Sequence, residues 1–188
     1  MQIDRNNKAD AWLAHSQREQ SGRLTIFLGA APGVGKTFAM LSRAHELMGQ
    51  GHHVLVGVVE THGRADTEAL IQGLNVIPKK TVEYQDRFLD EMDLDQILKL
   101  KPEIVLVDEL AHRNVPNSRH EYRWQDVNEL LDAGIDVYST LNIQHLESLN
   151  DVVYQITGIR VTETVPDALL KRLKDIRLVD LPVPELLE

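Results

Sequence analysis

Short apolar runs alternate with amphipathic stretches along the chain. The runs are rich in β-branched residues and predict strands, whereas apolar positions three or four residues apart predict helices. Such helical stripes contain Met40, Ala44 and Leu47, then Trp124, Val127 and Leu131, and finally Leu146, Leu149, Val153 and Ile156. The predicted strands are Leu24–Gly29, Val54–Glu60, Ile104–Glu109 and Val137–Leu141, with a weaker one at Ile176–Val179.

Continuous apolar strands that alternate with helices indicate a parallel sheet covered by helices on both faces. We therefore expect an α/β fold with a mostly parallel sheet in the middle layer of a three-layer sandwich. In such folds a ligand binds beyond the carboxyl ends of the strands. The residues directly after each predicted strand are thus the first candidates for function.

Composition narrows the function classes. The 188 residues suit one domain, and 20 Lys and Arg against 29 Asp and Glu give a net charge of −9, which argues against a nucleic-acid-binding surface. There is no cysteine, so disulfides and Cys-ligated metal sites are excluded. The longest strongly apolar run, Val54–Val59, is far shorter than the roughly 20 residues of a membrane helix, and the amino end lacks a signal-peptide core. We expect a soluble, cytoplasmic chain with no membrane segment.

The first predicted strand is followed by GAAPGVGKT and then by a helical pattern. This order predicts a P-loop, whose main-chain N–H groups surround phosphates, and hence a sandwich like that of P-loop NTPases. Lys36 would contact the outer phosphates of ATP, and the Thr37 hydroxyl would bind Mg²⁺. Ala30 stands where the motif G-x-x-x-x-G-K-T has its first glycine. The residues expected at the nucleotide are Ala30, Gly33, Val34, Gly35, Lys36 and Thr37; the alternative is a glycine-rich turn that binds nothing.

An acidic pair follows the third predicted strand. The apolar run Ile104–Val107 carries Asp108 to the strand end, where it would hold the nucleotide's Mg²⁺ together with Thr37. Glu109 is a candidate catalytic residue because a glutamate at this place can orient or deprotonate the attacking water. The alternative is a solvated charge at the end of a strand.

Three further polar residues follow predicted strands. Arg64 is a candidate contact to phosphate or to a partner, although a lone loop arginine is usually solvated. Thr140 is a candidate sensor of the outer phosphate. Asn142 could have the same role, but we favour a helix N-cap for it.

The segment His112–Arg123 is the least core-like part of the chain. It contains Arg113, Arg119 and Arg123, and Pro116 with Asn117 predicts a turn. A solvated loop is the simplest interpretation, and a positive flap over the phosphates or a docking surface are the alternatives. The eight histidines show no metal-ligand spacing, so we expect no metal besides the Mg²⁺ of the nucleotide.

Five strings together resemble the N-terminal cytoplasmic domain of the KdpD family of osmosensitive potassium-channel sensor histidine kinases. They are GAAPGVGKT, GVVETHGRADT, VDELAH, RWQDVNELLDAGIDVYSTLNIQHLESLNDVV and ITGIRVTETVPD, and the likeness covers about residues 22–181. Phosphate-binding roles carry over to Gly33, Gly35, Lys36 and Thr37, and the acidic strand-end role to Asp108 with Glu109 beside it. The family also has Arg64, His112 and Gln144, for which the resemblance gives no role.

The resemblance implies an ATP-binding regulatory module of a two-component potassium and osmotic-stress sensor. Complete members of the family are anchored in the membrane and phosphorylate a response regulator that controls expression of a potassium transporter. We expect an N-terminal extension at 1–21, a sensor domain at 22–181 and the truncated start of a following segment at 182–188. The partners implied are ATP, the remainder of the sensor and, through it, the response regulator at the cytoplasmic face of the inner membrane. Without a phosphoacceptor helix and a kinase core, the chain is not expected to phosphorylate itself on histidine.

Two other functions stay open at the level of sequence. The chain could be a free-standing P-loop ATPase or small-molecule kinase that uses Glu109 and the arginines Arg113, Arg119 and Arg123. It could also be a protein-interaction module with a vestigial P-loop, against which the intact Lys36 and Asp108 argue.

Overall fold

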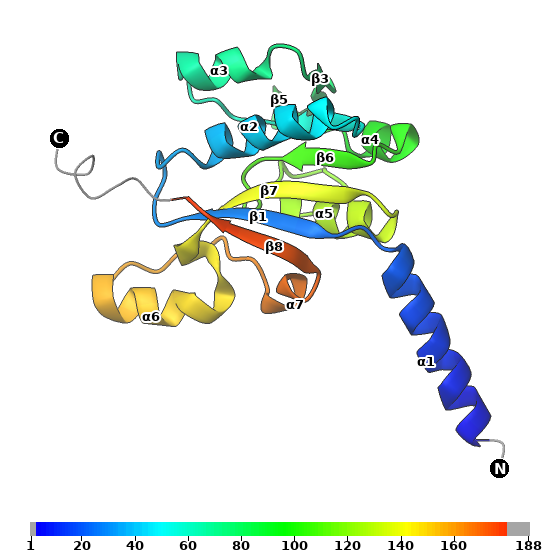
Figure 1. Cartoon of the computed structure of the whole chain (residues 1–188). Helices are drawn as coiled ribbons and strands as arrows, with labels where there is room; N and C mark the ends of the chain where they lie inside the picture. Colours follow the sequence, from blue (N-terminus) through cyan, green and yellow to red (C-terminus); the bar gives the residue numbers. More distant parts are fainter. Residues whose placement is uncertain (1–2, 180–188) are drawn as a thin grey trace.

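A single parallel sheet forms the centre of the molecule. The structure, a computed structural model, describes residues 3–179. Six strands pair in the order β3-β2-β6-β7-β1-β8, all parallel (Figure 1). Their bounds are β1 Leu24–Gly29, β2 Val54–Val58, β3 Asn75–Val76, β6 Ile104–Val107, β7 Asp136–Asn142 and β8 Leu173–Leu178. The predicted α/β class with a parallel sheet is confirmed, and the arrangement is consistent with a P-loop-like sandwich.

Helices cover both faces of this sheet (Figure 1). One core cluster joins α2 to residues of β1, β2 and β6, and α3 packs beside α2. A second cluster joins the opposite face to α4, α5 and α7. The bounds are α2 Lys36–Gly49, α3 Ala65–Ile71, α4 Leu94–Leu100, α5 Arg123–Asp132, η1 Ile143–His145, α6 Glu147–Thr157 and α7 Asp167–Leu170.

Each of the five predicted strands is present, but four have different ends, and β7 is one residue longer than predicted at each end. β2 ends at Val58 and β6 at Val107, each two residues earlier than predicted, and β8 begins three residues before Ile176. The predicted strand ends at Glu60 and Glu109 were therefore wrong. At Glu109 the reason is a left-handed backbone with φ of 54°, which an extended strand cannot contain.

The sequence pattern missed an antiparallel hairpin of β4 (Lys80–Tyr84) and β5 (Arg87–Glu91). Its turn residues Gln85 and Asp86 both have positive φ, 50° and 58°, as a two-residue type I′ turn requires. Most of its side chains are exposed, so no continuous apolar run marks the strands. The hairpin lies outside the six-stranded sheet.

The predicted segments at the two ends of the chain can be compared with the structure only at the amino end. The predicted extension 1–21 contains α1 (Ile3–Gln20), which projects away from the sheet (Figure 1). The predicted boundary at residue 181 and the segment 182–188 lie outside the described residues. Within residues 3–179, the helices are all too short or too polar to cross a membrane.

The stripe of Leu146, Leu149, Val153 and Ile156 correctly predicts a helix, α6. This helix buries none of its residues completely, and Ile156 is 79% exposed. By contrast, α2 buries Met40, Leu41, Ala44 and Leu47. Periodicity therefore identified both helices, but it did not show that only one belongs to the core.

Candidate functional site

The loop between β1 and α2 holds the predicted phosphate-binding glycines. Gly33 and Gly35 adopt left-handed conformations with φ of 85° and 95°, which other residues adopt only at a cost. A Cβ atom on Gly29 would lie 2.6 Å from Cγ2 of Val34 and 2.9 Å from Cδ of Lys36. The tight loop therefore leads directly into the amino end of α2, where main-chain N–H groups and the helix dipole favour an anion.

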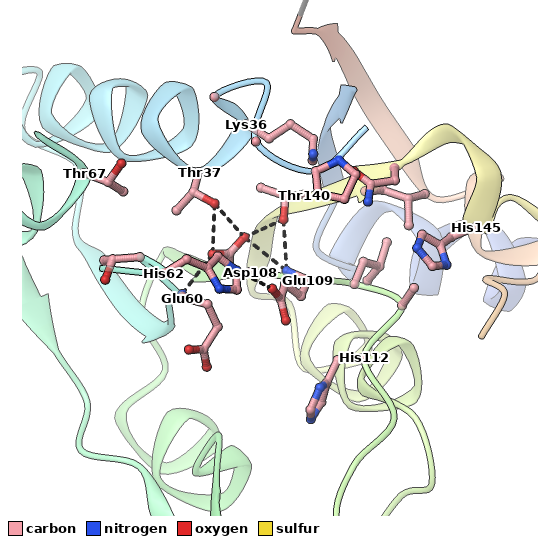
Figure 2. A pocket seen from close by; sticks show the side chains of 18 of the residues that line it. Lys36, Thr37, Glu60, His62, Thr67, Asp108, Glu109, His112, Thr140 and His145 are labelled. Carbon is pink, nitrogen blue, oxygen red and sulfur yellow. Dashed lines mark hydrogen bonds and ion pairs between the residues drawn. The ribbon is translucent and has the colours of Figure 1, made fainter. Parts of the chain in front are cut away.

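A cleft of about 740 Å³ opens beyond the carboxyl ends of the central strands (Figure 2). Its volume is typical of small-molecule sites, which measure about 300–1,000 Å³. The predicted site residues that line it are Gly33, Gly35, Lys36, Thr37, Arg64, Asp108, Glu109 and Thr140. Ala30 and Val34 belong to the same loop but are not among the lining residues, so only their main-chain groups are candidates for phosphate contact.

Lys36 reaches across its own loop. Its Nζ donates a hydrogen bond to the main-chain oxygen of Ala31 at 2.9 Å. Burial lowers the pKa of Lys36, the charge of Arg64 acts in the same direction, and the negative charges of Asp108 and Glu109 act against it. Both cations lie beside a cleft that also contains carboxylates, so the site carries charge of both signs.

Asp108 is the most buried charged residue of the cleft, at 1% exposure. Its carboxylate accepts hydrogen bonds from Thr37 Oγ1 at 3.1 Å, from the N–H of Glu60 at 3.0 Å and from the N–H of Glu109 at 3.1 Å. Thr140 Oγ1 donates a further one. Burial nevertheless raises the pKa of Asp108, and the nearby Glu109 adds to the shift, because the hydrogen bonds only partly offset the loss of water.

The order of the strands determines the position of Thr140. β7 lies between β1 and β6, so its carboxyl end lies between the end of β1, where the predicted phosphate loop begins, and the end of β6, where Asp108 follows. There the Thr140 hydroxyl donates to Asp108 and accepts the N–H of Glu109 at 2.9 Å. Thr140 therefore joins the two acidic residues from inside the sheet, a contact that the sequence did not reveal.

Glu109 lies at the rim of the cleft in a left-handed conformation, with φ of 54°. Its Oε1 lies 3.0 Å from Nε2 of His62, which also has a positive φ, 51°. Non-glycine residues seldom adopt this conformation, and where they do the surroundings hold them in it. The unusual backbone conformation of Glu109 and its contact with His62 therefore fix the position of its carboxylate at the rim of the cleft.

The loop between β2 and α3 touches both halves of the cleft. Arg64 Nη1 donates to the main-chain oxygen of Gly33 at 3.4 Å. Glu60 offers its N–H to Asp108 and its carboxylate to Lys79 at 3.1 Å. Arg64 is exposed, as a loop arginine usually is, but it also contacts the predicted phosphate loop.

The segment His112–Arg123 consists mainly of turns and bends, with both exposed and buried residues. Arg123 is buried and begins α5. Arg119 pairs with Asp95 and Glu129, away from the cleft. Of the three arginines, Arg113 is the one that lines the cleft, and it pairs with Glu121 at 3.0 Å. The alternative of a positive flap that brings all three arginines to the phosphates is therefore not supported.

Asn142 occupies the N-cap position of η1, but its side chain makes no capping hydrogen bond. Its Oδ1 is buried without a hydrogen-bond partner among the described residues, and the residue lines the cleft. The N-cap role that we favoured for its side chain was therefore wrong.

The oxygen atoms of Thr37 and Asp108 suit a hard divalent cation, since Mg²⁺ takes hydroxyl, carboxylate and water ligands. A buried carboxylate with a raised pKa would also gain from a neighbouring cation. The residues present therefore fit the Mg²⁺ of a nucleotide. Across residues 3–179, three or more His, Asp or Glu side chains do not come together in a cluster able to hold a metal.

Two residues at or near the site, His62 and Glu91, had no part in the sequence interpretation. His62 is two positions before Arg64, and only its place after a strand could have signalled a role. His112, which the family resemblance gave without a role, lines the cleft and bonds Glu91 of β5 at 2.9 Å. No sequence signal pointed to Glu91, because it lies in the missed hairpin.

One family model and several curated relatives match most of this chain. The family model "KdpD: Osmosensitive K+ channel His kinase sensor domain" matches residues 20–188. Sensor protein KdpD of Escherichia coli (strain K12) is 54% identical over 94% of this chain, and that of Mycobacterium tuberculosis (strain H37Rv) is 51% identical over 94%. The chain spans 20% of the length of each of these relatives. A putative sensor protein KdpD of Synechocystis is 50% identical over 93% of the chain, which spans 47% of that relative.

Proposed function

The chain belongs to the KdpD sensor-domain family, and from that premise we propose that it binds ATP with Mg²⁺ as a regulatory module. The module would serve a two-component sensor kinase that responds to potassium and osmotic stress. Occupation of the cleft would modulate the phosphorelay from the kinase core to a response regulator, and so the expression of a potassium transporter.

One observation carries the nucleotide part of the proposal. Thr37 Oγ1, at the start of α2, lies 3.1 Å from the carboxylate of Asp108, at the end of β6. These residues are 71 positions apart in the chain, yet the fold brings the phosphate loop and the acidic strand end into one cleft. Lys36 and the N–H groups of the loop would hold the phosphates, and Thr37 with Asp108 would hold Mg²⁺. The cation would neutralise phosphate charge.

The test is a calorimetric titration of the purified chain with ATP and Mg²⁺. Lys36→Ala removes the main side-chain contact to the phosphates, and we expect at least a tenfold weaker affinity, equivalent to about 1.4 kcal/mol. Lys99→Ala is the matched control, because Lys99 is exposed on α4. Equal affinities of wild type and Lys36→Ala would contradict the proposal.

A free-standing ATPase or small-molecule kinase is the second candidate, favoured by the constrained Glu109 at the rim of the cleft. Phosphate release measured in the same samples distinguishes the candidates. Turnover that Glu109→Gln abolishes would support an enzyme, whereas binding without turnover would support a module that reads nucleotide occupancy. Of the arginines proposed for this chemistry, Arg113 alone lines the cleft.

A further inference from the structure

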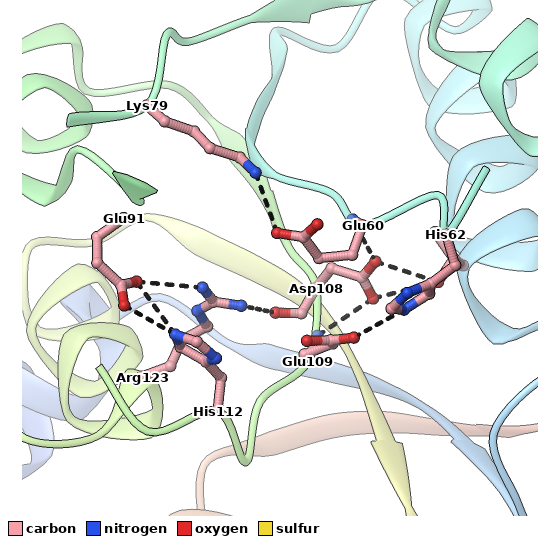
Figure 3. Close-up of polar contacts among 9 residues, drawn as sticks. Glu60, His62, Lys79, Glu91, Asp108, Glu109, His112 and Arg123 are labelled. Carbon is pink, nitrogen blue, oxygen red and sulfur yellow. Dashed lines mark hydrogen bonds and ion pairs between the residues drawn. The ribbon is translucent and has the colours of Figure 1, made fainter. Parts of the chain in front are cut away.

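Arg123 connects the acidic half of the cleft to a part of the molecule outside the main sheet. The side chain is 2% exposed, and α5 begins at this residue. Its Nη1 donates to the main-chain oxygen of Asp108 at 2.9 Å, and its Nη2 lies 3.4 Å from Oε2 of Glu91 (Figure 3). A buried guanidinium thus bridges the end of β6 and the end of β5.

The main-chain contact fixes a single peptide group. Arg123 holds the oxygen of the peptide between Asp108 and Glu109, and the N–H of the same peptide donates to Asp108 Oδ1 at 3.1 Å and Thr140 Oγ1 at 2.9 Å. Both ends of this peptide plane are therefore bound. Its orientation determines where the Asp108 carboxylate lies and holds Glu109 in the left-handed conformation, with φ of 54°.

Glu91 supplies the charge that Arg123 needs in the interior. It is 6% exposed and accepts hydrogen bonds from the N–H of Val115 at 2.8 Å and from His112 Nε2 at 2.9 Å. Burial alone would raise the pKa of Glu91, but the bonds from His112 and Val115 and the charges of His112 and Arg123 outweigh it and hold the pKa below its usual range. A buried arginine without such a carboxylate would be strongly destabilising.

We propose that Arg123 is a positioning residue for the magnesium half of the site, and that Glu91 of the β4–β5 hairpin is its anchor. The proposal rests on the proposed nucleotide function. The hairpin, which lies outside the main sheet, would thereby help to hold the magnesium half of the site in place. A displacement of Glu91 would turn the Asp108–Glu109 peptide and weaken Mg²⁺ binding without touching the phosphate loop.

The experiment separates the two halves of the site. The affinity for ATP is measured with Mg²⁺ and again in EDTA for wild type, Arg123→Met, Arg123→Lys and Glu91→Gln. Arg119→Met is the matched control, since Arg119 lies on the same segment but pairs with Asp95 and Glu129. Circular dichroism and the Tm report whether each variant is folded.

For Arg123→Met we expect affinity with Mg²⁺ to fall about tenfold, equivalent to about 1.4 kcal/mol, while affinity in EDTA changes less than about twofold. Lysine can reach one of the two partners but lacks the forked guanidinium, so Arg123→Lys should lose less. Glu91→Gln should shift the Mg²⁺ dependence in the same direction. If Arg123 and Glu91 act as one unit, the double variant is no worse than Arg123→Met alone.

A readout without ligand completes the test. Amide hydrogen exchange at Glu109 should accelerate in Arg123→Met, whereas exchange at Gln50, whose N–H donates to the main-chain oxygen of Glu46 at the end of α2, should not change. If Arg123→Met does not fold, Arg123→Lys and Glu91→Gln carry the comparison.

A folded variant with the wild-type Mg²⁺ dependence and wild-type exchange at Glu109 would overturn the inference. If wild type and Lys36→Ala bind ATP equally, the proposed function itself fails. If only Lys36→Ala loses binding, the function stands and the positioning role is refuted.

Discussion

The cleft has two walls of different construction. The phosphate-loop wall is one contiguous segment, Gly29–Thr37, whose shape depends on backbone conformation. The acidic wall combines Glu60, Asp108, Glu109 and Thr140 from three separate segments. Its key side chains, Asp108 and Thr140, are almost completely buried.

The difference determines how each wall responds to change. A loop held by backbone geometry can lose its ligand while the core stays intact, because its residues are mostly outside the core. A wall of buried, hydrogen-bonded side chains contributes to folding as well as to binding, since each buried polar group needs its partner. We therefore expect the acidic wall to couple binding to stability and the loop wall to separate them.

Thr140→Val should produce the largest loss of stability. Valine has nearly the same shape but leaves Asp108 without one donor and the Glu109 N–H without one acceptor. The variant loses one hydrogen bond to a carboxylate, about 1.5–3 kcal/mol, and one to a main-chain N–H, about 0.5–1.5 kcal/mol, so we expect a loss of roughly 2–4 kcal/mol in urea denaturation. Thr162→Val is the exposed control and should change stability little. A Thr140→Val protein as stable as wild type would show that the acidic wall is not part of the folding core.

The cost of burying a carboxylate can be isolated at Asp126, which lies outside the cleft. Burial raises its pKa to about 6 from an ordinary value of 3.8, against the effects of Asn114, His120 and Arg123, while Glu91 adds to the shift. Between these values the folded protein binds more protons than the unfolded chain, so stability falls as pH rises. The loss is at most about 3 kcal/mol.

Urea denaturation from pH 4 to pH 7 checks this dependence in wild type and Asp126→Asn. The variant should gain stability relative to wild type as pH rises, because its amide does not ionise. If the free energy of unfolding changed with pH in the same way in both proteins, the pH dependence would not come from Asp126.

Gly33→Ala tests the loop wall. The position has φ of 85°, and a Cβ atom would lie 2.8 Å from Nη2 of Arg64, the movable end of a long side chain. A left-handed alanine costs about 1–2 kcal/mol, a strain that the loop can relieve by rearranging outside the core. The rearranged loop should bind ATP at least tenfold more weakly, while the Tm changes little. Calorimetry and Tm are measured together. A Tm loss without an affinity loss would reverse the expected separation of binding from stability.

Gly49→Ala should have the smallest effect and the opposite sign. Gly49 ends α2, has no positive φ and has open space around its Cβ position. Alanine in place of a helical glycine adds up to about 1 kcal/mol of stability. Affinity for ATP should be unchanged. A loss of stability would mean that the end of α2 needs glycine for a reason outside backbone conformation.

The central strands and the glycine-rich turn between β1 and α2 were predictable because both are local in sequence. An apolar run such as Ile104–Val107 specifies a buried strand wherever it lies, and GAAPGVGKT contains its glycines, lysine and threonine within nine positions. The position of Asp108 after a strand also followed from the chain. Its nearness to Thr37 was an inference from the expected topology, and the structure places the two side chains in contact.

The acidic wall could be predicted only in part. Thr140 was one of several polar residues after strands, and its bonds to Asp108 and Glu109 depend on β7 lying between β1 and β6. Arg123 was expected on a solvated segment, yet it is buried because Glu91, 32 residues earlier, neutralises it. Separations of this length leave no periodic pattern in the sequence.

The sequence by itself determined the α/β class, the glycine-rich loop after β1 and the family, because each rests on contiguous residues whose backbone preferences and spacing can be read along the chain. The tertiary structure alone decided which polar residues share the cleft, that α6 stays exposed while α2 is buried, and that Arg123 holds the Asp108–Glu109 peptide. The physical reason is that the burial of a side chain and the pairing of its charge depend on residues from distant segments of the chain. Strand order and packing determine which of those residues lie beside it.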